Sequence, residues 1–139
     1  MIKISNIYKS FNSKMILDGV DFEINKGECV VIIGKSGSGK SVLLKHILGL
    51  LIPDKGYIEI DGITLRGLKY RQLQKLRSKI GMVFQSGALF DSLTVNDNIK
   101  IALDRLTNLD DEKLQQRINN SLLEVGMKDT NHLMPSELS

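Results

Sequence analysis

The segment at residues 34–41 constrains this chain more than any other part of the sequence. It is GKSGSGKS and fits the pattern G-x-x-x-x-G-K-[ST]. A continuous apolar run precedes it at residues 29–33, and apolar residues at helical spacing follow it at residues 40–50. Glycines let backbone N–H groups approach an anion closely and allow positive φ angles. A strand, this loop and a helix in that order predict a site for the phosphates of a nucleoside triphosphate.

Two side chains of the loop have specific expected roles. Lys40 can place its charge between the β- and γ-phosphates, and the Ser41 hydroxyl can reach Mg²⁺. Lys35 occupies a free position of the pattern, so its side chain is expected to be solvated. The loop residues expected to contact the nucleotide are Gly34, Lys35, Ser36, Gly37, Ser38, Gly39, Lys40 and Ser41. The motif by itself does not separate kinases, GTPases and transport ATPases.

The composition is that of an ordinary globular protein. With 139 residues, 42% hydrophobic and 25% charged, the chain is long enough for one domain with a core and is not a disordered tail. A net charge of +3 points to no polyanion in particular, and no nucleic-acid partner is expected. Cys29 is the only cysteine, so no internal disulfide is possible; we expect a small buried hydrophobe in a reducing compartment.

No segment resembles a secretory signal or a membrane span. The most apolar stretch, residues 42–52, is too short to cross a bilayer and is interrupted by Lys45 and His46. We therefore expect a soluble, cytoplasmic chain.

Strands are expected mainly in the first part of the chain. Residues 2–8 and 20–24 alternate between apolar and polar side chains, and residues 57–65 form a hairpin around an Asp-Gly turn. Residues 29–33 and 80–85 are continuous apolar runs, typical of strands buried on both faces.

Helices are expected mainly in the last part. Beyond the helix after the glycine-rich loop, residues 69–78 have helical spacing. Thr94 and Asp97 form a capping box for a helix through Leu106, and a further helix starts at Asp110 and stops at Gly126. The sequence thus predicts an α/β fold.

The order of these features resembles the ATP-binding domain of ABC transporters. Lys40 and Gln85 are 45 residues apart, a spacing similar to that between the phosphate loop and the Q-loop of the family. The resemblance implies that Gln85 contacts Mg²⁺ and the attacking water. The alternative for Gln85 is a polar residue at the end of a strand.

Two further positions match the family at the ends of the chain. Phe11 matches the aromatic residue that stacks on adenine; the alternative is a strand residue packed in the core. The final residues, LMPSELS, resemble the start of the LSGGQ signature, with Leu138 and Ser139 as its first two positions. In the family this signature closes over the γ-phosphate held by a second subunit, which implies that Ser139 contacts ATP in a homodimer.

The segment after Gln85 is similar to that of the ATPases of Mla-type lipid transporters, which move phospholipids between the membranes of Gram-negative bacteria. It contains Ser-Gly-Ala at 86–88 and has Asp91 where the wider family usually has proline. Leu89, Phe90 and Leu93 would dock on the membrane subunit. The alternative for these apolar side chains is burial under the last helices.

The resemblance implies ATP and Mg²⁺ as cofactors. It also implies three kinds of partner: an integral membrane permease, a second ATPase subunit, and lipid-binding transporter components. The ATPase would lie peripherally on the inner face of the bacterial inner membrane.

The implied fold is an ABC-type P-loop NTPase, with an antiparallel β part at its N-terminus and the start of a helical subdomain. Residues 1–85 would form the β-rich nucleotide-binding part, and residues 86–139 the helical part, ending at the signature and before the Walker B strand. Asp61 belongs to the hairpin turn, and His46 and His132 do not match the switch histidine of the family.

Three functions stay open at this point. The first is the ATPase subunit of a lipid transporter. The second is a truncated chain that binds nucleotide without turning it over, and the third is a P-loop kinase. Residues 86–139 hold no arginine-rich lid, which disfavours the kinase. Lys40 and Gln85 are the only catalytic residues that match, so the 139 residues alone are expected not to hydrolyse ATP at a useful rate.

Overall fold

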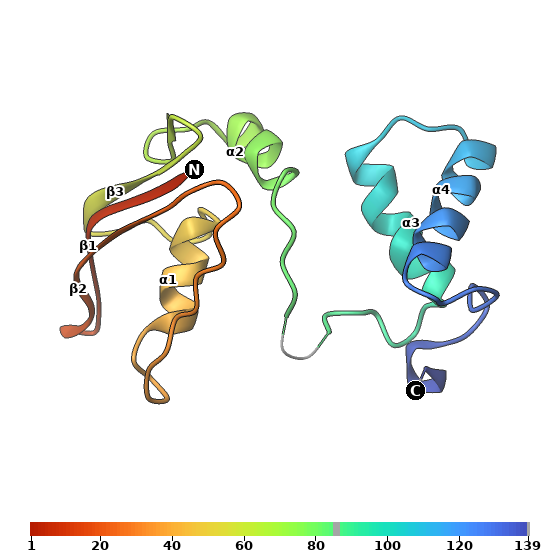
Figure 1. Ribbon diagram of the computed structural model, residues 1–139, viewed down its shortest axis with the longest axis horizontal. Helices are drawn as coiled ribbons and strands as arrows, with labels where there is room; N and C mark the ends of the chain where they lie inside the picture. Colours follow the sequence, from red (N-terminus) through yellow and green to blue (C-terminus); the bar gives the residue numbers. More distant parts are fainter. Residues whose placement is uncertain (85–86, 139) are drawn as a thin grey trace. The chain divides into compact units, whose positions relative to one another are not determined.

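The computed structural model describes residues 1–84 and 87–138, and the chain divides into two compact units. Unit 1 is Met1–Gly81 and holds a sheet with two helices, whereas unit 2 is Met82–Ser139 and is helical (Figure 1). Each unit is described by itself below.

An antiparallel sheet of four strands forms the frame of unit 1. The strands are β1 (Ile2–Phe11), β2 (Lys14–Ile24), β3 (Lys55–Ile60) and β4 (Ile63–Thr64), in the order β2-β1-β3-β4. The long strand β1 pairs with β2 along one edge and with β3 along the other. The predicted antiparallel β part is confirmed.

The hairpin between β3 and β4 turns as predicted. Asp61 and Gly62 both have positive φ, 49° and 79°, as a two-residue turn of this kind requires. One Asp61 carboxylate oxygen accepts a hydrogen bond from the Met1 ammonium at 2.7 Å. This hydrogen bond and the ammonium charge lower the pKa of Asp61. Asp61 is therefore a turn residue with a structural partner.

Both helices of unit 1 pack on the sheet through one apolar core. Helix α1 is Lys40–Ile47 and helix α2 is Tyr70–Arg77. The buried core residues come from three strands and both helices: Ile4, Ile7, Leu17, Leu43, Ile47, Ile58, Ile60 and Leu76. His46 of α1 is fully buried beside them, and its Nδ1 lies 2.7 Å from the carbonyl oxygen of Val42.

Arg77 joins α2 to the C-terminal end of α1. Its Nε donates to the carbonyl oxygen of Leu48 at 2.9 Å, and a terminal nitrogen donates to that of Gly49 at 2.7 Å. The last carbonyls of a helix have no partner within the helix, so the planar guanidinium satisfies two acceptors at once.

The two continuous apolar runs are not strands, which corrects the prediction. Residues 29–33 and 80–84 have no regular secondary structure, and Val31, Ile33 and Val83 are 74%, 90% and 95% exposed. A strand buried on both faces needs neighbouring strands, and all four strands in the described ranges belong to the antiparallel sheet. Cys29, expected to be buried, is exposed for the same reason.

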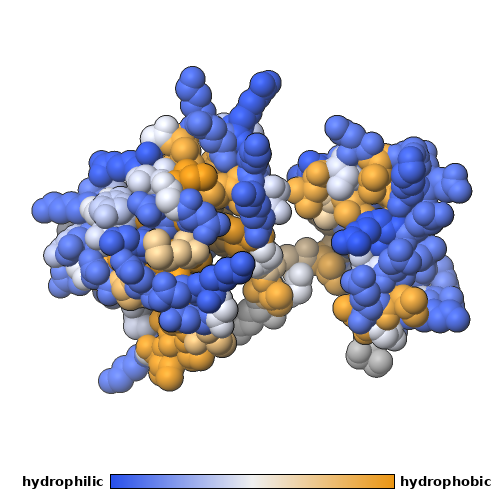
Figure 2. All heavy atoms as spheres, turned by 45° about the horizontal axis from the view of Figure 1, so that its top comes forward, coloured by the Kyte–Doolittle hydropathy of each residue, from blue (hydrophilic) through white to orange (hydrophobic). Residues whose placement is uncertain are grey.

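These exposed apolar residues change the surface of the protein. Figure 2 shows apolar side chains, coloured orange, reaching the surface among the polar ones. The sequence pattern thus identified the apolar character of the two runs correctly and their secondary structure incorrectly.

Unit 2 contains α3 (Val95–Leu106), α4 (Asp111–Glu124) and a short 3₁₀ helix (Pro135–Glu137). Its buried core is made of Val95, Leu114, Ile118 and Leu122. The predicted helix between Asp110 and Gly126 is therefore confirmed as α4. Within the described ranges, no helix is long and apolar enough to cross a bilayer.

The predicted caps of both helices are present. The Thr94 hydroxyl accepts from the backbone N–H of Asp97 at 3.2 Å and donates to the Asp97 carboxylate at 2.8 Å. The Asp110 carboxylate accepts from the backbone N–H of Lys113 at 2.9 Å and from its ammonium at 2.7 Å. The pKa of Asp110 is lowered chiefly by the Lys113 ammonium.

Candidate nucleotide-binding site

The glycine-rich loop, residues 34–41, packs against β2 at Gly39 and is open at Gly37. Gly39 has φ 95°, and a Cβ there would lie 3.0 Å from both the carbonyl oxygen of Ile16 and a methyl carbon of Leu17. Gly37 has φ 78°, and a Cβ there would meet no described atom within 4 Å. Gly39 therefore has to be glycine to pass close to β2, and the open side of Gly37 leaves room for an anion.

Lys40 lies within this loop. Its ammonium donates to the carbonyl oxygens of Gly34 and Lys35 at 2.7 Å and 2.9 Å. These contacts hold the charge over the loop and not out in solvent. These contacts use two of the three N–H donors of the ammonium, so the third can meet a phosphate oxygen while the long side chain is already partly ordered.

The first turn of α1 supplies the remaining donors. The initial N–H groups of a helix have no intrahelical acceptor, and the helix dipole adds partial positive charge there. The first turn of α1 carries no acidic residue and its cap residue, Gly39, makes no side-chain cap. Ser41 is exposed in this turn, where a hydroxyl can meet Mg²⁺. These residues fit a Mg²⁺-bound triphosphate.

Phe11 is the last residue of β1 and is 42% exposed. It is not a core residue, so that alternative is wrong. The Lys9 ammonium lies 5.4 Å from the centroid of the ring. The part of Phe11 in adenine binding stays a prediction, and an exposed ring at a strand end suits it.

Gln85 and Ser139 lie outside the described residues. Their predicted contacts with Mg²⁺, water and the γ-phosphate stay predictions. Leu138, the neighbour of Ser139, packs against the core of unit 2.

The predicted docking segment is exposed and has an anchor that the sequence did not reveal. Leu89 and Phe90 are 50% and 58% exposed, so burial under the last helices is wrong for both, while Leu93 is half-buried. The Asn98 side chain of α3 accepts from the N–H of Phe90 at 2.8 Å. It also donates to the carbonyls of Phe90, Leu93 and Thr94 at 2.9–3.1 Å. The only sign of these contacts in the sequence is an asparagine in the first turn of a predicted helix.

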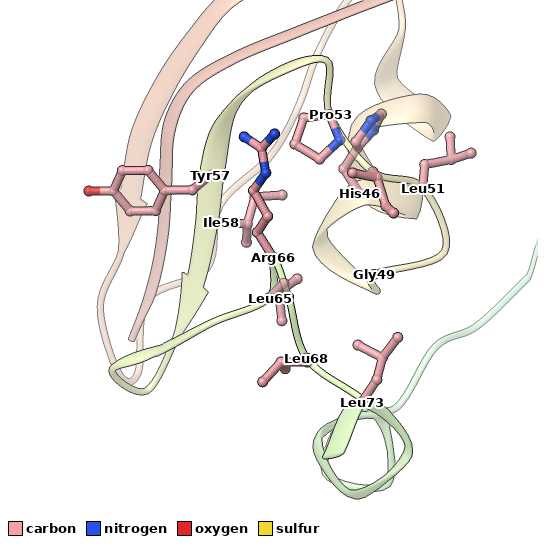
Figure 3. A pocket seen from close by; sticks show the side chains of 12 residues that line it. His46, Gly49, Leu51, Pro53, Tyr57, Ile58, Leu65, Arg66, Leu68 and Leu73 are labelled. Atoms are coloured by element: carbon pink, nitrogen blue, oxygen red, sulfur yellow. The ribbon is translucent and has the colours of Figure 1, made fainter. Parts of the chain in front are cut away.

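A cavity of about 130 Å³ lies elsewhere in unit 1 (Figure 3). It is walled by apolar side chains such as Leu65, Leu68 and Leu73, with His46 and Arg66 as its main polar residues. None of residues 34–41 lines it, so it is distinct from the phosphate loop.

A comparison with protein-family models removes one of the three functions left open. The model described as ABC transporter matches residues 17–139. The chain belongs to the ABC transporter family. The phosphate loop, α1 and all of unit 2 lie inside the match. The kinase alternative is thereby excluded.

Curated ABC relatives match the whole of the chain. It is 44% identical to TRIGALACTOSYLDIACYLGLYCEROL 3, a chloroplast protein of Arabidopsis thaliana. It is 37% identical to the intermembrane phospholipid transport system ATP-binding protein MlaF of Haemophilus influenzae. It is 40% identical to the methionine import ATP-binding protein MetN of Legionella pneumophila (strain Lens). All 139 residues are covered in each case, but the chain spans only 40%, 53% and 40% of the respective relatives.

A solved ABC structure confirms the fold. The ATP-binding cassette MJ0796, in a dimeric post-hydrolysis state bound to ADP and Pi, matches with a TM-score of 0.84 and 34% identity. The match covers 100% of this chain and 63% of that one. The ABC-type P-loop NTPase fold is therefore confirmed.

Proposed function

We propose that the chain is the nucleotide-binding part of an ABC transporter subunit that couples ATP binding and hydrolysis to lipid transport. The observation that carries the ATP part is the Lys40 ammonium, which is held by two carbonyls of the glycine-rich loop at the start of α1. The lipid part is supported by the phospholipid named for the MlaF relative and the glycolipid named for the chloroplast relative.

Methionine import is the second candidate function. The MetN relative of Legionella pneumophila is 40% identical, between the values for the two lipid-named relatives. The ATPase activity of the complete membrane complex that contains the protein, measured with phospholipid and with methionine, separates the two candidates. Stimulation by phospholipid and not by methionine supports lipid transport, whereas stimulation by methionine and by no lipid supports the second.

The proposal includes partners and a location. A permease would bind the exposed segment with Leu89 and Phe90, and a second ATPase subunit would close over the nucleotide through Ser139. Lipid-binding components would complete the transporter at the inner face of the bacterial inner membrane. The dimeric state named for MJ0796 supports the second subunit.

For catalysis we propose binding without useful turnover by these 139 residues alone. Lys40 and Ser41 would hold the phosphates and Mg²⁺, and Gln85 would orient water. Phosphoryl transfer is catalysed by positioning and charge stabilisation, and requires a metal-binding aspartate and a water-activating glutamate as well. No pair of acidic residues in the sequence matches these roles.

Titration of the protein with fluorescently labelled ATP in Mg²⁺ tests the ATP site. Lys40→Ala removes a charge-assisted contact and should weaken binding by about ten- to a hundredfold. Lys26→Ala is the control, because Lys26 is an exposed lysine in the turn after β2 and lies outside the loop. It should change affinity by less than about twofold. Equal affinities of the wild type and Lys40→Ala would overturn the assignment of the loop.

A further inference from the structure

The end of β1 that carries Phe11 is held by a residue outside the sheet. Pairing of β1 with β3 extends only to Tyr8, opposite Lys55. Beyond this point the backbone N–H of Asp54 donates to the carbonyl of Tyr8 at 2.9 Å. The Asp54 carboxylate accepts from the N–H of Ser10 at 2.8 Å. Asp54 thus continues the hydrogen-bond ladder up to the residue next to Phe11.

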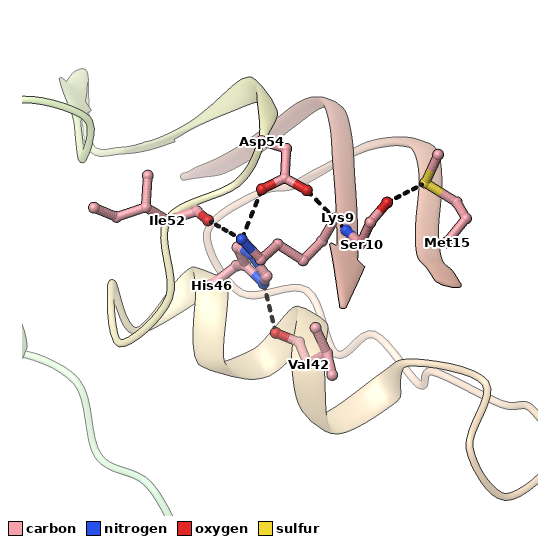
Figure 4. A network of polar contacts seen from close by, with 7 residues as sticks. All are labelled: Lys9, Ser10, Met15, Val42, His46, Ile52 and Asp54. Carbon is pink, nitrogen blue, oxygen red and sulfur yellow. Dashed lines mark hydrogen bonds and ion pairs between the residues drawn. The ribbon is translucent and has the colours of Figure 1, made fainter. Parts of the chain in front are cut away.

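Lys9 closes the arrangement from the other side (Figure 4). Its ammonium lies 2.7 Å from the second Asp54 oxygen and 3.1 Å from the carbonyl oxygen of Ile52. The Lys9 side chain is only 17% exposed, so the ion pair is better shielded than a typical surface pair. The same ammonium lies over the Phe11 ring, within the range of a cation–π contact.

Resting on the proposed function, we propose that Lys9 and Asp54 are positioning residues for the nucleotide base. Asp54 fixes the backbone beside Phe11, the Lys9 ammonium covers one face of the ring, and the other face would stack on adenine. Holding the ring before the base arrives lowers the ordering cost of binding. Asp54 also follows the loop after α1, the helix that begins at the phosphate loop. Asp54 thereby links the proposed binding site for the base to the proposed binding site for the phosphates.

Comparison of two ligands tests this role, because only one of them has a base. The protein is titrated with ATP and with inorganic tripolyphosphate, each with Mg²⁺. Asp54→Ala should weaken ATP binding by about three- to tenfold and leave tripolyphosphate within about twofold. Lys9→Met should act in the same direction while leaving the Asp54–Ser10 hydrogen bond in place. Glu23→Ala, which breaks the 2.8 Å ion pair with Lys3 at the opposite end of β1, should change neither affinity.

A double-mutant cycle shows whether Asp54 acts through the ring. In a Phe11→Ala background, Asp54→Ala should produce no further loss of ATP affinity, since the ring that it positions is gone. The positioning role is overturned if ATP affinity is unchanged in Asp54→Ala and Lys9→Met. It is also overturned if both ligands weaken equally, or if the losses with Phe11→Ala add. A wild type that binds neither ligand would overturn the proposed function itself.

Discussion

Replacement of Asn98 by aspartate tests how the exposed segment before α3 is held. The Asn98 side-chain oxygen accepts from the N–H of Phe90, and its amide group donates to the carbonyls of Phe90, Leu93 and Thr94. Asn98→Asp has the same shape and keeps the acceptor. It loses both N–H donors and turns a second oxygen toward three carbonyl oxygens.

The expected cost follows from the bonds that are lost. Two N–H donors contribute about 0.5–1.5 kcal/mol each, and partial exposure favours the lower half, so we expect a loss of about 1–2 kcal/mol. A carboxylate near the start of α3 gains up to about 1 kcal/mol from the helix dipole, while repulsion by three carbonyls opposes this gain. For a unit of this size the midpoint of thermal unfolding should fall by roughly 4–16 °C.

Circular dichroism during heating measures the effect, with Asn119→Asp as the control. The Asn119 side-chain oxygen accepts from Gln115 at 3.1 Å and from Asn131 at 2.8 Å. Aspartate keeps both bonds, so its effect should stay within about 0.5 kcal/mol. If Asn98→Asp is as stable as Asn119→Asp, the amide does not hold this segment and the reasoning is wrong.

Three further predictions concern binding, docking and acid stability. Phe11→Ala should weaken ATP and GTP by similar factors, about 5- to 150-fold, because stacking does not distinguish the bases; parallel titrations would expose a selective loss of ATP, which contradicts stacking. If the proposed permease docks on this segment, Leu89→Asp and Phe90→Asp should each release it without loss of ATP binding, and retention of the permease by both variants refutes docking. The pKa of Asp110 is lowered in the folded state, so the stabilisation from its carboxylate is complete above about pH 5 and is lost as the pH falls through the lowered pKa. In a titration of helix content with acid, Asp110→Asn should therefore lose less helix at low pH than the wild type. An unchanged acid transition speaks against the cap.

Local signals in the sequence predicted the local structure well. The glycine-rich loop, the Asp-Gly turn at residues 61–62 and the caps at Thr94 and Asp110 each depend on residues close together in the chain. Their geometry is therefore encoded where it forms. The contacts of Lys40 with the carbonyls of its own loop are equally local but were not predicted, and its contact with the phosphates stays a prediction.

Features that depend on distant partners were not predictable. The run at residues 29–33 has the composition of a buried strand, but a strand forms only beside another strand. From the sequence, Asp54 could be assigned only to a turn after a helix. Its contacts could not be predicted, because its partners Lys9 and Ser10 precede it by more than 40 residues. Nothing in the local pattern distinguishes such an aspartate from a solvated one.

Arg77 has a mechanical consequence for the helix that begins at the phosphate loop. Helix α1 has eight residues and is therefore about 12 Å long, a rod that does not bend over so short a length. Gly39 packs closely against β2 at the N-terminal end of α1. The guanidinium of Arg77 donates hydrogen bonds to the carbonyls of Leu48 and Gly49 just after the C-terminal end. We expect that a tilt of α1, caused by a ligand at its N-terminal end, would displace α2 as well. Lysine in place of Arg77 would bind one carbonyl instead of two, so that α1 and α2 would be coupled less rigidly.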